Sequence, residues 1–114
     1  MSLPEFTRKL IEGKLTKYCK GRFPEDNSHN LRLTYRIDEN SVTILLSRPY
    51  FRKPAKWAER AVAQMRFDHD HKEWQLYFMD RNNHWRPYPF TQPNSDFDDL
   101  LQELNRDPMV LFWG

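Results

Sequence analysis

The alternating Asp and His residues at 68–71 are of the types that can bind a metal ion. Imidazole nitrogen and carboxylate oxygen atoms are common ligands of divalent cations. A metal site needs three or four converging ligands, however, and close to this segment only Glu73 offers another. Asp and His also tolerate the backbone geometry of turns. The pattern therefore favours a solvated turn over a metal site, and His69 and His71 are weak metal candidates.

Signals for catalysis or for a bound cofactor are sparse. Asp68, Lys72 and Glu73 are residue types that metal-dependent nucleases use, but their spacing across one turn is not a signature of such a site. The chain has no Gly-x-Ser-x-Gly motif, and Cys19 falls on the expected buried face of a helix, where a thiol is usually structural. The three glycines, at 13, 21 and 114, form no phosphate-binding loop. We therefore expect no cofactor, and an enzyme, such as a metal-dependent hydrolase or nuclease, is the least favoured function.

Basic and aromatic residues alternate in two stretches of the chain, and this is the remaining functional signal. Single-stranded nucleic-acid binders combine cations for the phosphates with rings on which bases stack. The same residue types are also typical of core aromatics surrounded by Arg and Lys stems, and of hot spots in protein interfaces. The candidate binding residues are Arg48, Tyr50, Phe51, Arg52, Lys53, Lys56, Trp57, Arg81 and Trp85.

The composition indicates one folded domain, residues 1–114. The eight Phe, five Tyr and four Trp residues predict an aromatic core. The single cysteine, Cys19, excludes an internal disulfide and favours a reducing compartment, so we expect a cytoplasmic protein. No apolar run approaches the roughly 20 residues that span a membrane, and the first residues are unlike a signal peptide. The formal net charge is +2, with basic residues gathered early in the chain and acidic residues late.

Helical spacing of apolar residues predicts one helix near each end of the chain. The first begins at a capping box over residues 2–5 and ends near residue 20, and the second is capped by Ser95 and ends at Asp107 and Pro108. The apolar tail at 109–114 should then pack onto the domain or a partner chain. The expected apolar stripes are Phe6, Leu10, Ile11, Leu15, Tyr18 and Cys19 in the first helix, and Phe97, Leu100, Leu101 and Leu104 in the second.

Alternation of apolar and polar residues predicts about five strands between the helices, near residues 31–37, 42–47, 57–68, 74–79 and 84–88. The third segment also fits a helix, because Ala58, Ala61, Val62 and Met65 have helical spacing. A turn follows it, however, and an alternating strand follows the turn, which favours an antiparallel strand. Pro87 assigns the last strand to an edge of the sheet.

The simplest architecture is α+β: an N-terminal helix, an antiparallel meander of about five strands, a C-terminal helix and a packed apolar tail. We expect the two helices to cover one face of the sheet and to leave the other face partly open. Trp74, Leu76 and Phe78 should lie in the core. Function is then expected beside the hairpin at 73–88, on the loop at 48–57 and around Arg81 and Trp85.

A set of short motifs extends in order along nearly the whole chain: Arg48-Pro49, Lys72-x-Trp74, Tyr77-Phe78-Met79, Arg81, Trp85, Tyr88, Asp107-Pro108 and Phe112-Trp113-Gly114. This order resembles a family of small bacterial proteins catalogued as domain of unknown function three-zero-two-four. Asp80 and Asn83 stand where that family would be expected to carry more basic residues. The resemblance implies a bacterial, single-domain protein without an established biochemical role, and it supplies no catalytic residues.

The most favoured function is a non-enzymatic interaction module that binds a protein partner or forms a homodimer. Its anchors would be exposed rings on the sheet, the Phe112 and Trp113 tail, or the sheet edge at Pro87. The alternative is single-stranded nucleic-acid binding through the basic and aromatic surface. No membrane interaction is expected.

Overall fold

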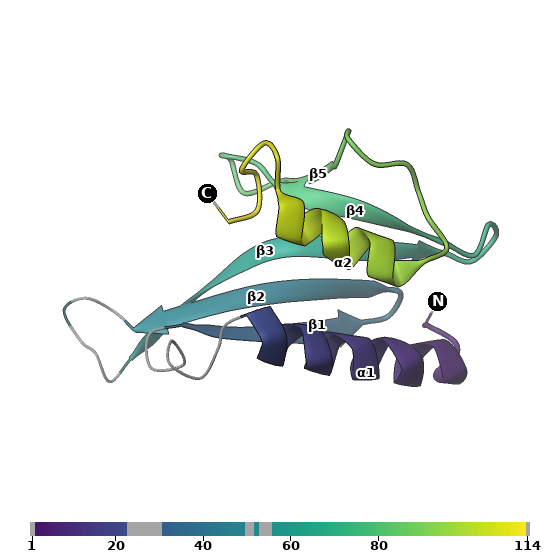
Figure 1. Cartoon of the computed structure of the whole chain (residues 1–114), viewed down its shortest axis with the longest axis horizontal. Coiled ribbons are helices and arrows are strands. Elements are labelled where there is room, and N and C mark those ends of the chain that lie inside the picture. The colour runs from purple at the N-terminus through teal and green to yellow at the C-terminus, as the bar shows by residue number, and fades with distance from the viewer. Residues whose placement is uncertain (1, 23–30, 50–51, 53–55, 114) are drawn as a thin grey trace.

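The computed structural model describes residues 2–22, 31–49, 52 and 56–113. Within these residues a five-stranded antiparallel sheet follows the order of the chain, β1-β2-β3-β4-β5, with one helix before it and one after it (Figure 1). The predicted α+β meander is therefore confirmed. The elements are α1 (Glu5–Arg22), β1 (Arg32–Asp38), β2 (Ser41–Pro49), β3 (Trp57–Asp68), β4 (Glu73–Met79), β5 (Trp85–Pro87) and α2 (Phe97–Arg106).

The segment that fitted both a helix and a strand forms β3, so the strand prediction is confirmed and the helix alternative is wrong. Pairing with β2 extends from Trp57 to Arg66 and is interrupted once, where Ala61 and Ala63 pair with the adjacent residues Leu45 and Ile44. Val62 is the extra residue of this β-bulge, and it is buried next to the buried Ala63. Because a bulge allows two successive side chains to point to one face, the simple alternation of the sequence is broken here.

The core lies between the sheet and the two helices, which cover the same face of the sheet (Figure 1). As predicted, Trp74 is at its centre, with 2% of its surface exposed, and its ring contacts the rings of Phe67 and Phe97. Ile11 and Leu15 from α1 join four residues of α2 in the same cluster. The buried residues of α2 are the predicted Phe97, Leu100, Leu101 and Leu104.

The predicted apolar stripe of α1 is wrong at two positions. The side chains of Phe6 and Leu10 are 80% and 51% exposed. The buried line of the helix passes through Ile11 and Leu15, and Leu10 lies about 100° around the helix axis from Ile11 because each residue turns by that angle. At the N-terminal end the core is closed by Leu3, which is buried and whose N–H donates to the carbonyl of Glu39 at 3.1 Å.

Helix α2 begins one residue later than predicted. Its N-cap is Asp96 rather than Ser95, and the Asp96 carboxylate accepts from the N–H of Asp98 at 3.0 Å. Either residue type can cap a helix, so spacing alone could not choose between neighbours. The helix ends as predicted at Asp107, which has a left-handed backbone with φ of 36°.

The apolar tail packs onto the domain, as predicted. The Asp107 carboxylate accepts backbone N–H groups of Leu111, Phe112 and Trp113 at 2.8 to 3.3 Å. Phe112 is fully buried, and the Trp113 indole N–H donates to the Leu104 carbonyl at 2.7 Å. The Phe112 ring is therefore used inside the domain, whereas Met109 and Val110 at the start of the tail are 55% and 62% exposed.

Candidate functional site on the uncovered face of the sheet

The face of the sheet opposite the helices is the open face. Side chains of a strand alternate between the two faces, so the strand positions between the core residues point to this side. The register places side chains of neighbouring strands in rows across it. The open face comprises Arg32, Thr34, Arg36 and Asp38 of β1, Ser41, Thr43, Leu45 and Ser47 of β2, Trp57, Glu59, Ala61, Gln64, Arg66 and Asp68 of β3, Glu73, Gln75, Tyr77 and Met79 of β4, and Trp85 and Pro87 of β5.

A chain of polar contacts fixes four side chains at the centre of the open face. The Gln64 amide donates to the Thr43 hydroxyl at 3.0 Å, and its carbonyl oxygen accepts from Arg66 Nε at 2.7 Å. The Arg66 guanidinium carbon lies 4.0 Å from the centroid of the Tyr77 ring. The electrostatic attraction between a cation and a ring face stabilises this contact. Both the NH2 group and the carbonyl oxygen of the Gln64 amide have a partner. The result is an ordered series, Thr43, Gln64, Arg66 and Tyr77, across β2, β3 and β4.

A second cation and ring pair lies at the far end of the same face. The guanidinium carbon of Arg32 is 4.1 Å from the centroid of the Trp57 ring. Arg32 pairs with Ser47 on β2, and Trp57 pairs with Pro49. The contact therefore crosses the sheet from β1 to β3 over the intervening β2.

Between these two pairs the face has an apolar patch. Leu45 is only 7% exposed, although it lies outside the core cluster beneath the helices. It pairs with Ala61 on β3 and with Thr34 on β1. The half-buried Met79 and Trp85 pair with each other at the β5 edge. The face thus combines aromatic rings, an aliphatic patch and fixed Arg side chains.

Charges on the open face are mixed. Three arginines, Arg32, Arg36 and Arg66, are accompanied by four carboxylates on the same face. Asp38, Asp68 and Glu73 lie at the end of the sheet where the β1–β2 and β3–β4 turns are, whereas Glu59 faces Ser47 nearer the other end. Arg66 lies in the same cross-strand row as Asp38, through Ser41, so basic and acidic groups are neighbours at the end of the face near these turns.

The predicted site residues do not form one cluster. Trp57 and Trp85 both lie on the open face, but at separate places, and Arg81 is exposed in the turn between β4 and β5. Arg48 is exposed near the end of β2 at a position that points to the helix side, and Arg52 and Lys56 are exposed beyond it. Tyr50, Phe51 and Lys53 lie outside the described residues.

Sequence reasoning missed Arg32, Arg36, Gln64, Arg66 and Tyr77 as site residues. The signal was present in the alternation, because each of these positions lies between residues expected in the core. What the sequence did not show was the register, which brings Arg66 of β3 next to Tyr77 of β4.

The Asp68 to His71 segment forms a solvated turn with an internal ion pair. His71 Nδ1 lies 2.8 Å from Asp68 Oδ2, and this contact lowers the pKa of Asp68 and raises that of His71. The His69 ring packs against Phe67 instead. Among the described residues no group of three or more His, Cys, Asp and Glu side chains could hold a metal ion.

Other potential chemical groups are held in structural roles. Burial raises the pKa of Cys19 to about 11, which keeps its thiol protonated and unreactive at neutral pH. In the β4–β5 turn, Arg86 holds the pKa of Asp80 at about 2, with help from the N–H groups of His84 and Asn82. No helix within the described ranges has the length and apolar character to cross a membrane.

A groove of about 810 Å³ separates the two helices on the covered side. Lys14 of α1 forms an ion pair with Asp98 of α2 across it, and Tyr18 donates to Asn105 at 3.0 Å. These contacts join the helices to each other. The groove therefore presents mainly groups that already have partners, and it has less binding potential than the open face.

Comparison with known proteins identifies a family without an assigned activity. No curated protein and no solved structure matches the chain. One family model, described as Domain of unknown function (DUF3024), matches residues 3–114. Because the match includes nearly the whole chain, the chain belongs to this family of unknown function.

Proposed function

We propose that this chain is a non-enzymatic interaction module that binds a partner protein on its open face. The observation that carries the proposal is the ordered series of Thr43, Gln64, Arg66 and Tyr77 on an uncovered sheet surface. Gln64 and Arg66 are half-buried and lie outside the core cluster. A binding surface benefits from such order, because side chains already held in place lose less entropy when a partner binds.

The composition of the open face matches the centre of a protein interface. Arg, Trp, Tyr and Met are enriched at such centres, and Tyr77, Met79, Trp85 and Arg66 supply one of each. Leu45 and Ala61 provide the flat apolar area between them. A matching partner has an apolar side chain for this area and carboxylates that reach Arg36 and Arg66. A carboxylate paired with Arg accepts two parallel hydrogen bonds, which fix the orientation of the contact and also strengthen it.

The charge balance favours a protein over a nucleic acid at this surface. Nucleic-acid affinity depends on an excess of Lys and Arg that replaces the counterions of the phosphates. The open face has three arginines and four carboxylates, so it offers no such excess. The partner is expected in a reducing compartment such as the cytoplasm, given the single free cysteine, Cys19.

The test compares two matched variants in affinity capture. Arg66→Ala combined with Tyr77→Ala removes two members of the ordered series, whereas Arg106→Ala changes an exposed residue of α2 on the helix side. A protein retained by wild type and by Arg106→Ala should be lost with the double variant. Binding of that protein in purified form, measured by calorimetry, should weaken at least tenfold in the double variant, in keeping with loss of a hot spot of more than 1 kcal/mol.

Two results would contradict this proposal. The first is equal retention of every bound protein by wild type and the double variant. The second is loss of all retention after nuclease treatment, which would assign the binding to nucleic acid. Folding of each variant is checked by urea unfolding, so that a loss of binding is not a loss of structure.

A second candidate function is supported by a separate observation, the basic end of the sheet. Arg48 and Lys56 are exposed there, adjacent in the chain or the register to Trp57 of the Arg32 and Trp57 pair, and Arg52 is also exposed. Arg48 and Arg60 point to the helix side of this end, where Arg60 donates to the Phe112 carbonyl at 3.1 Å, and Glu59 is the carboxylate on the open side of β3 next to Trp57. Cations next to a ring are the elements of a single-stranded nucleic-acid site.

This second function predicts salt-dependent binding of an oligonucleotide. Fluorescence anisotropy with a mixed single strand of about 16 nucleotides should show affinity that falls steeply as salt rises. Arg52→Ala combined with Lys56→Ala should flatten that salt dependence without changing the urea midpoint. Absence of binding at low salt would remove this function and leave the protein-binding proposal intact.

A further inference from the structure

The two edges of the sheet are built differently. β5 has three residues and contains Pro87, which has no N–H to offer to another strand. β1 has seven residues, contains no proline, pairs with β2 without a bulge, and has no second strand beside it among the described residues. Proteins commonly protect edge strands by making them short or irregular. Of the two edge strands, β1 is therefore the one better suited to pair with a strand of another chain.

The residues of β1 are complementary to a second copy of the same strand. In an antiparallel pair centred on Tyr35, the Cα positions of Arg32 in each copy and Asp38 in the other are directly opposite, and the Arg32 guanidinium exchanges its contact with the Trp57 ring, 4.1 Å away, for the Asp38 carboxylate. On the opposite side of the strand Leu33 faces Ile37, two apolar residues that pack toward the core. Opposite charges and apolar pairs directly across two strands each stabilise the pairing. A pairing displaced by two residues along the strand would lose the Arg32 and Asp38 contacts.

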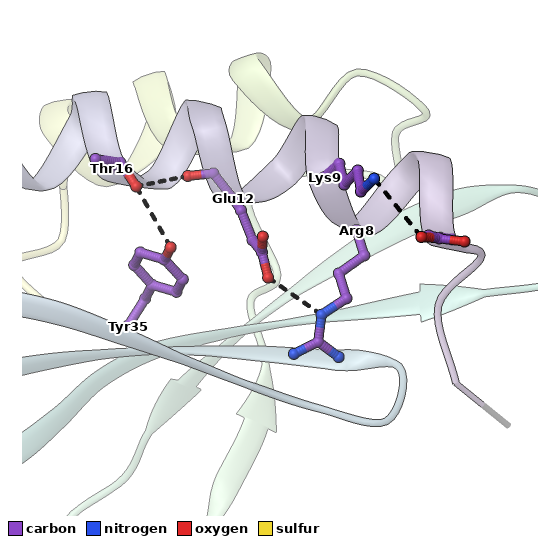
Figure 2. A network of polar contacts seen from close by, with 6 residues as sticks. Arg8, Lys9, Glu12, Thr16 and Tyr35 are labelled. Carbon is purple, nitrogen blue, oxygen red and sulfur yellow. Dashed lines mark hydrogen bonds and ion pairs between the residues drawn. The ribbon is translucent and has the colours of Figure 1, made fainter.

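The surroundings of the β1 edge leave room for a second copy. A shallow groove of about 620 Å³ lies along α1 beside this edge, and its lining includes Lys9, Glu12, Gly13, Thr16, Lys20 and Tyr35. A side chain added at Gly13 would meet open space. Figure 2 shows Tyr35 extending from β1 to Thr16 on α1, with 3.3 Å between the two hydroxyl oxygens.

The contact between Tyr35 and Thr16 fixes where the helices of two copies would meet. If the twofold axis passes Tyr35, it also passes close to Thr16, so the two α1 helices lie antiparallel on the same side of the joined sheet. Glu12, whose carboxylate accepts from Arg8 Nε of its own chain at 3.1 Å, then also faces the exposed Lys20 of the other copy. Charge complementarity therefore holds in the helix layer as well as in the strand.

We propose that two copies of this chain associate through antiparallel pairing of β1, which joins their sheets into one sheet of ten strands. The interface is isologous, meaning that the same surface is used by both copies, as in most homodimers. The main-chain groups on the free side of β1 form the ladder, and the Arg32 and Asp38 pairs select the register. Both open faces then lie on the same side of the joined sheet.

The first experiment exchanges the charges that set the register. Arg32→Asp alone, and Asp38→Arg alone, place like charges opposite each other at both ends of the pairing. Sedimentation equilibrium should show a dimer for wild type and a dimer dissociation constant at least tenfold higher for each single variant. The double variant, Arg32→Asp with Asp38→Arg, restores opposite charges and should restore the dimer.

The second experiment tests the position of the axis with single cysteines in a Cys19→Ser background. Residues directly opposite in an antiparallel pair have Cα atoms about 4.5 to 5.5 Å apart, which a disulfide can bridge. Tyr35→Cys should therefore form a disulfide-linked dimer under mild oxidation. Thr34→Cys is the matched control, because Thr34 faces Arg36 of the second copy and its own counterpart is too distant to be linked.

Four outcomes would overturn the proposal. A strictly monomeric wild-type chain at high concentration removes the dimer. Dimers that persist equally in wild type and both single charge variants, a charge-exchanged double variant that stays monomeric although folded, or linkage at Thr34→Cys rather than Tyr35→Cys each remove the β1 register. The Arg66→Ala and Tyr77→Ala variant should remain dimeric, which separates this interface from the open face and from the proposed partner site.

Discussion

The two faces of this one sheet use similar residues for different purposes. On the covered face, Trp74 is enclosed by Phe67 and Phe97 and serves the core. On the open face, Tyr77 of the same strand is half-buried and lies against a guanidinium group. Strand alternation thus places some of the aromatic side chains in the core and others on the open face. A ring in this chain is assigned to one set by the face on which it lies.

The largest expected effect is on the covered face. Trp74→Ala should reduce the free energy of unfolding by about 3 to 5 kcal/mol, because it leaves a large cavity among packed rings. Urea unfolding measures this change. A Trp74→Ala variant with a nearly unchanged free energy of unfolding would contradict the contrast between the two faces, since it would mean that the covered face does not supply the core.

The next largest effect concerns the tail that closes the covered face. Asp107→Ala should cost about 1 to 3 kcal/mol, because the N–H groups of Leu111, Phe112 and Trp113 lose their acceptor. Asp107→Asn is the matched control, since Asn tolerates the left-handed backbone and its amide oxygen keeps one of the two acceptor oxygens that hold these N–H groups. The Asn variant should therefore lose less stability than the Ala variant. Equal losses would show that one acceptor oxygen is not enough to anchor the tail.

A smaller effect is expected on the open face. Tyr77→Ala should cost only about 1 kcal/mol, which is the scale of a cation and ring contact that is not deeply buried. Comparison with Trp74→Ala in the same urea experiment sharpens the contrast, because the two residues are three apart on one strand. A cost for Tyr77→Ala as large as that for Trp74→Ala would show that the open face also stabilises the fold.

The smallest effect is a pH dependence local to the β4–β5 turn. Arg86 and backbone N–H groups lower the pKa of Asp80 to about 2, whereas an unfolded Asp has a pKa of about 3.9. The folded state is therefore stabilised above about pH 4, and this contribution is lost as pH falls to about 2. Asp80→Asn should reduce the pH dependence of the urea midpoint in this window. An unchanged pH profile would contradict the role of the Arg86 pair.

The sequence predicted the order and type of the elements because most of them have a clear period. β1 alternates strictly, and α2 has an amphipathic stripe that matched the structure at Phe97, Leu100, Leu101 and Leu104. The stripe of α1 was less well predicted, because Phe6 and Leu10 are apolar but exposed. Periodicity shows that a helix has an apolar side, but only tertiary packing decides where the sheet meets it.

The candidate site was predicted only in part, and the reason is physical. The sequence indicated that one face would stay open, and the open face includes the predicted Trp57 and Trp85. The contact of Arg66 with Tyr77 depends on the register of β3 with β4, and the contact of Arg32 with Trp57 reaches across a third strand. The residues of these two contacts are far apart in the chain or separated by a turn, so no local sequence pattern predicts the contacts.

The β-bulge at Val62 determines which residues of β3 lie on each face of the sheet. Strand side chains follow an odd and even rule, and the extra residue reverses that rule partway along β3. Before Val62, odd-numbered residues such as Trp57 and Glu59 face the open side; after it, even-numbered residues such as Gln64 and Arg66 do so. The one extra residue of the bulge therefore exchanges the faces to which odd-numbered and even-numbered residues of β3 point. Without it, continuous pairing from the Arg66 side would turn Trp57 toward the helices and place Arg60 on the open face.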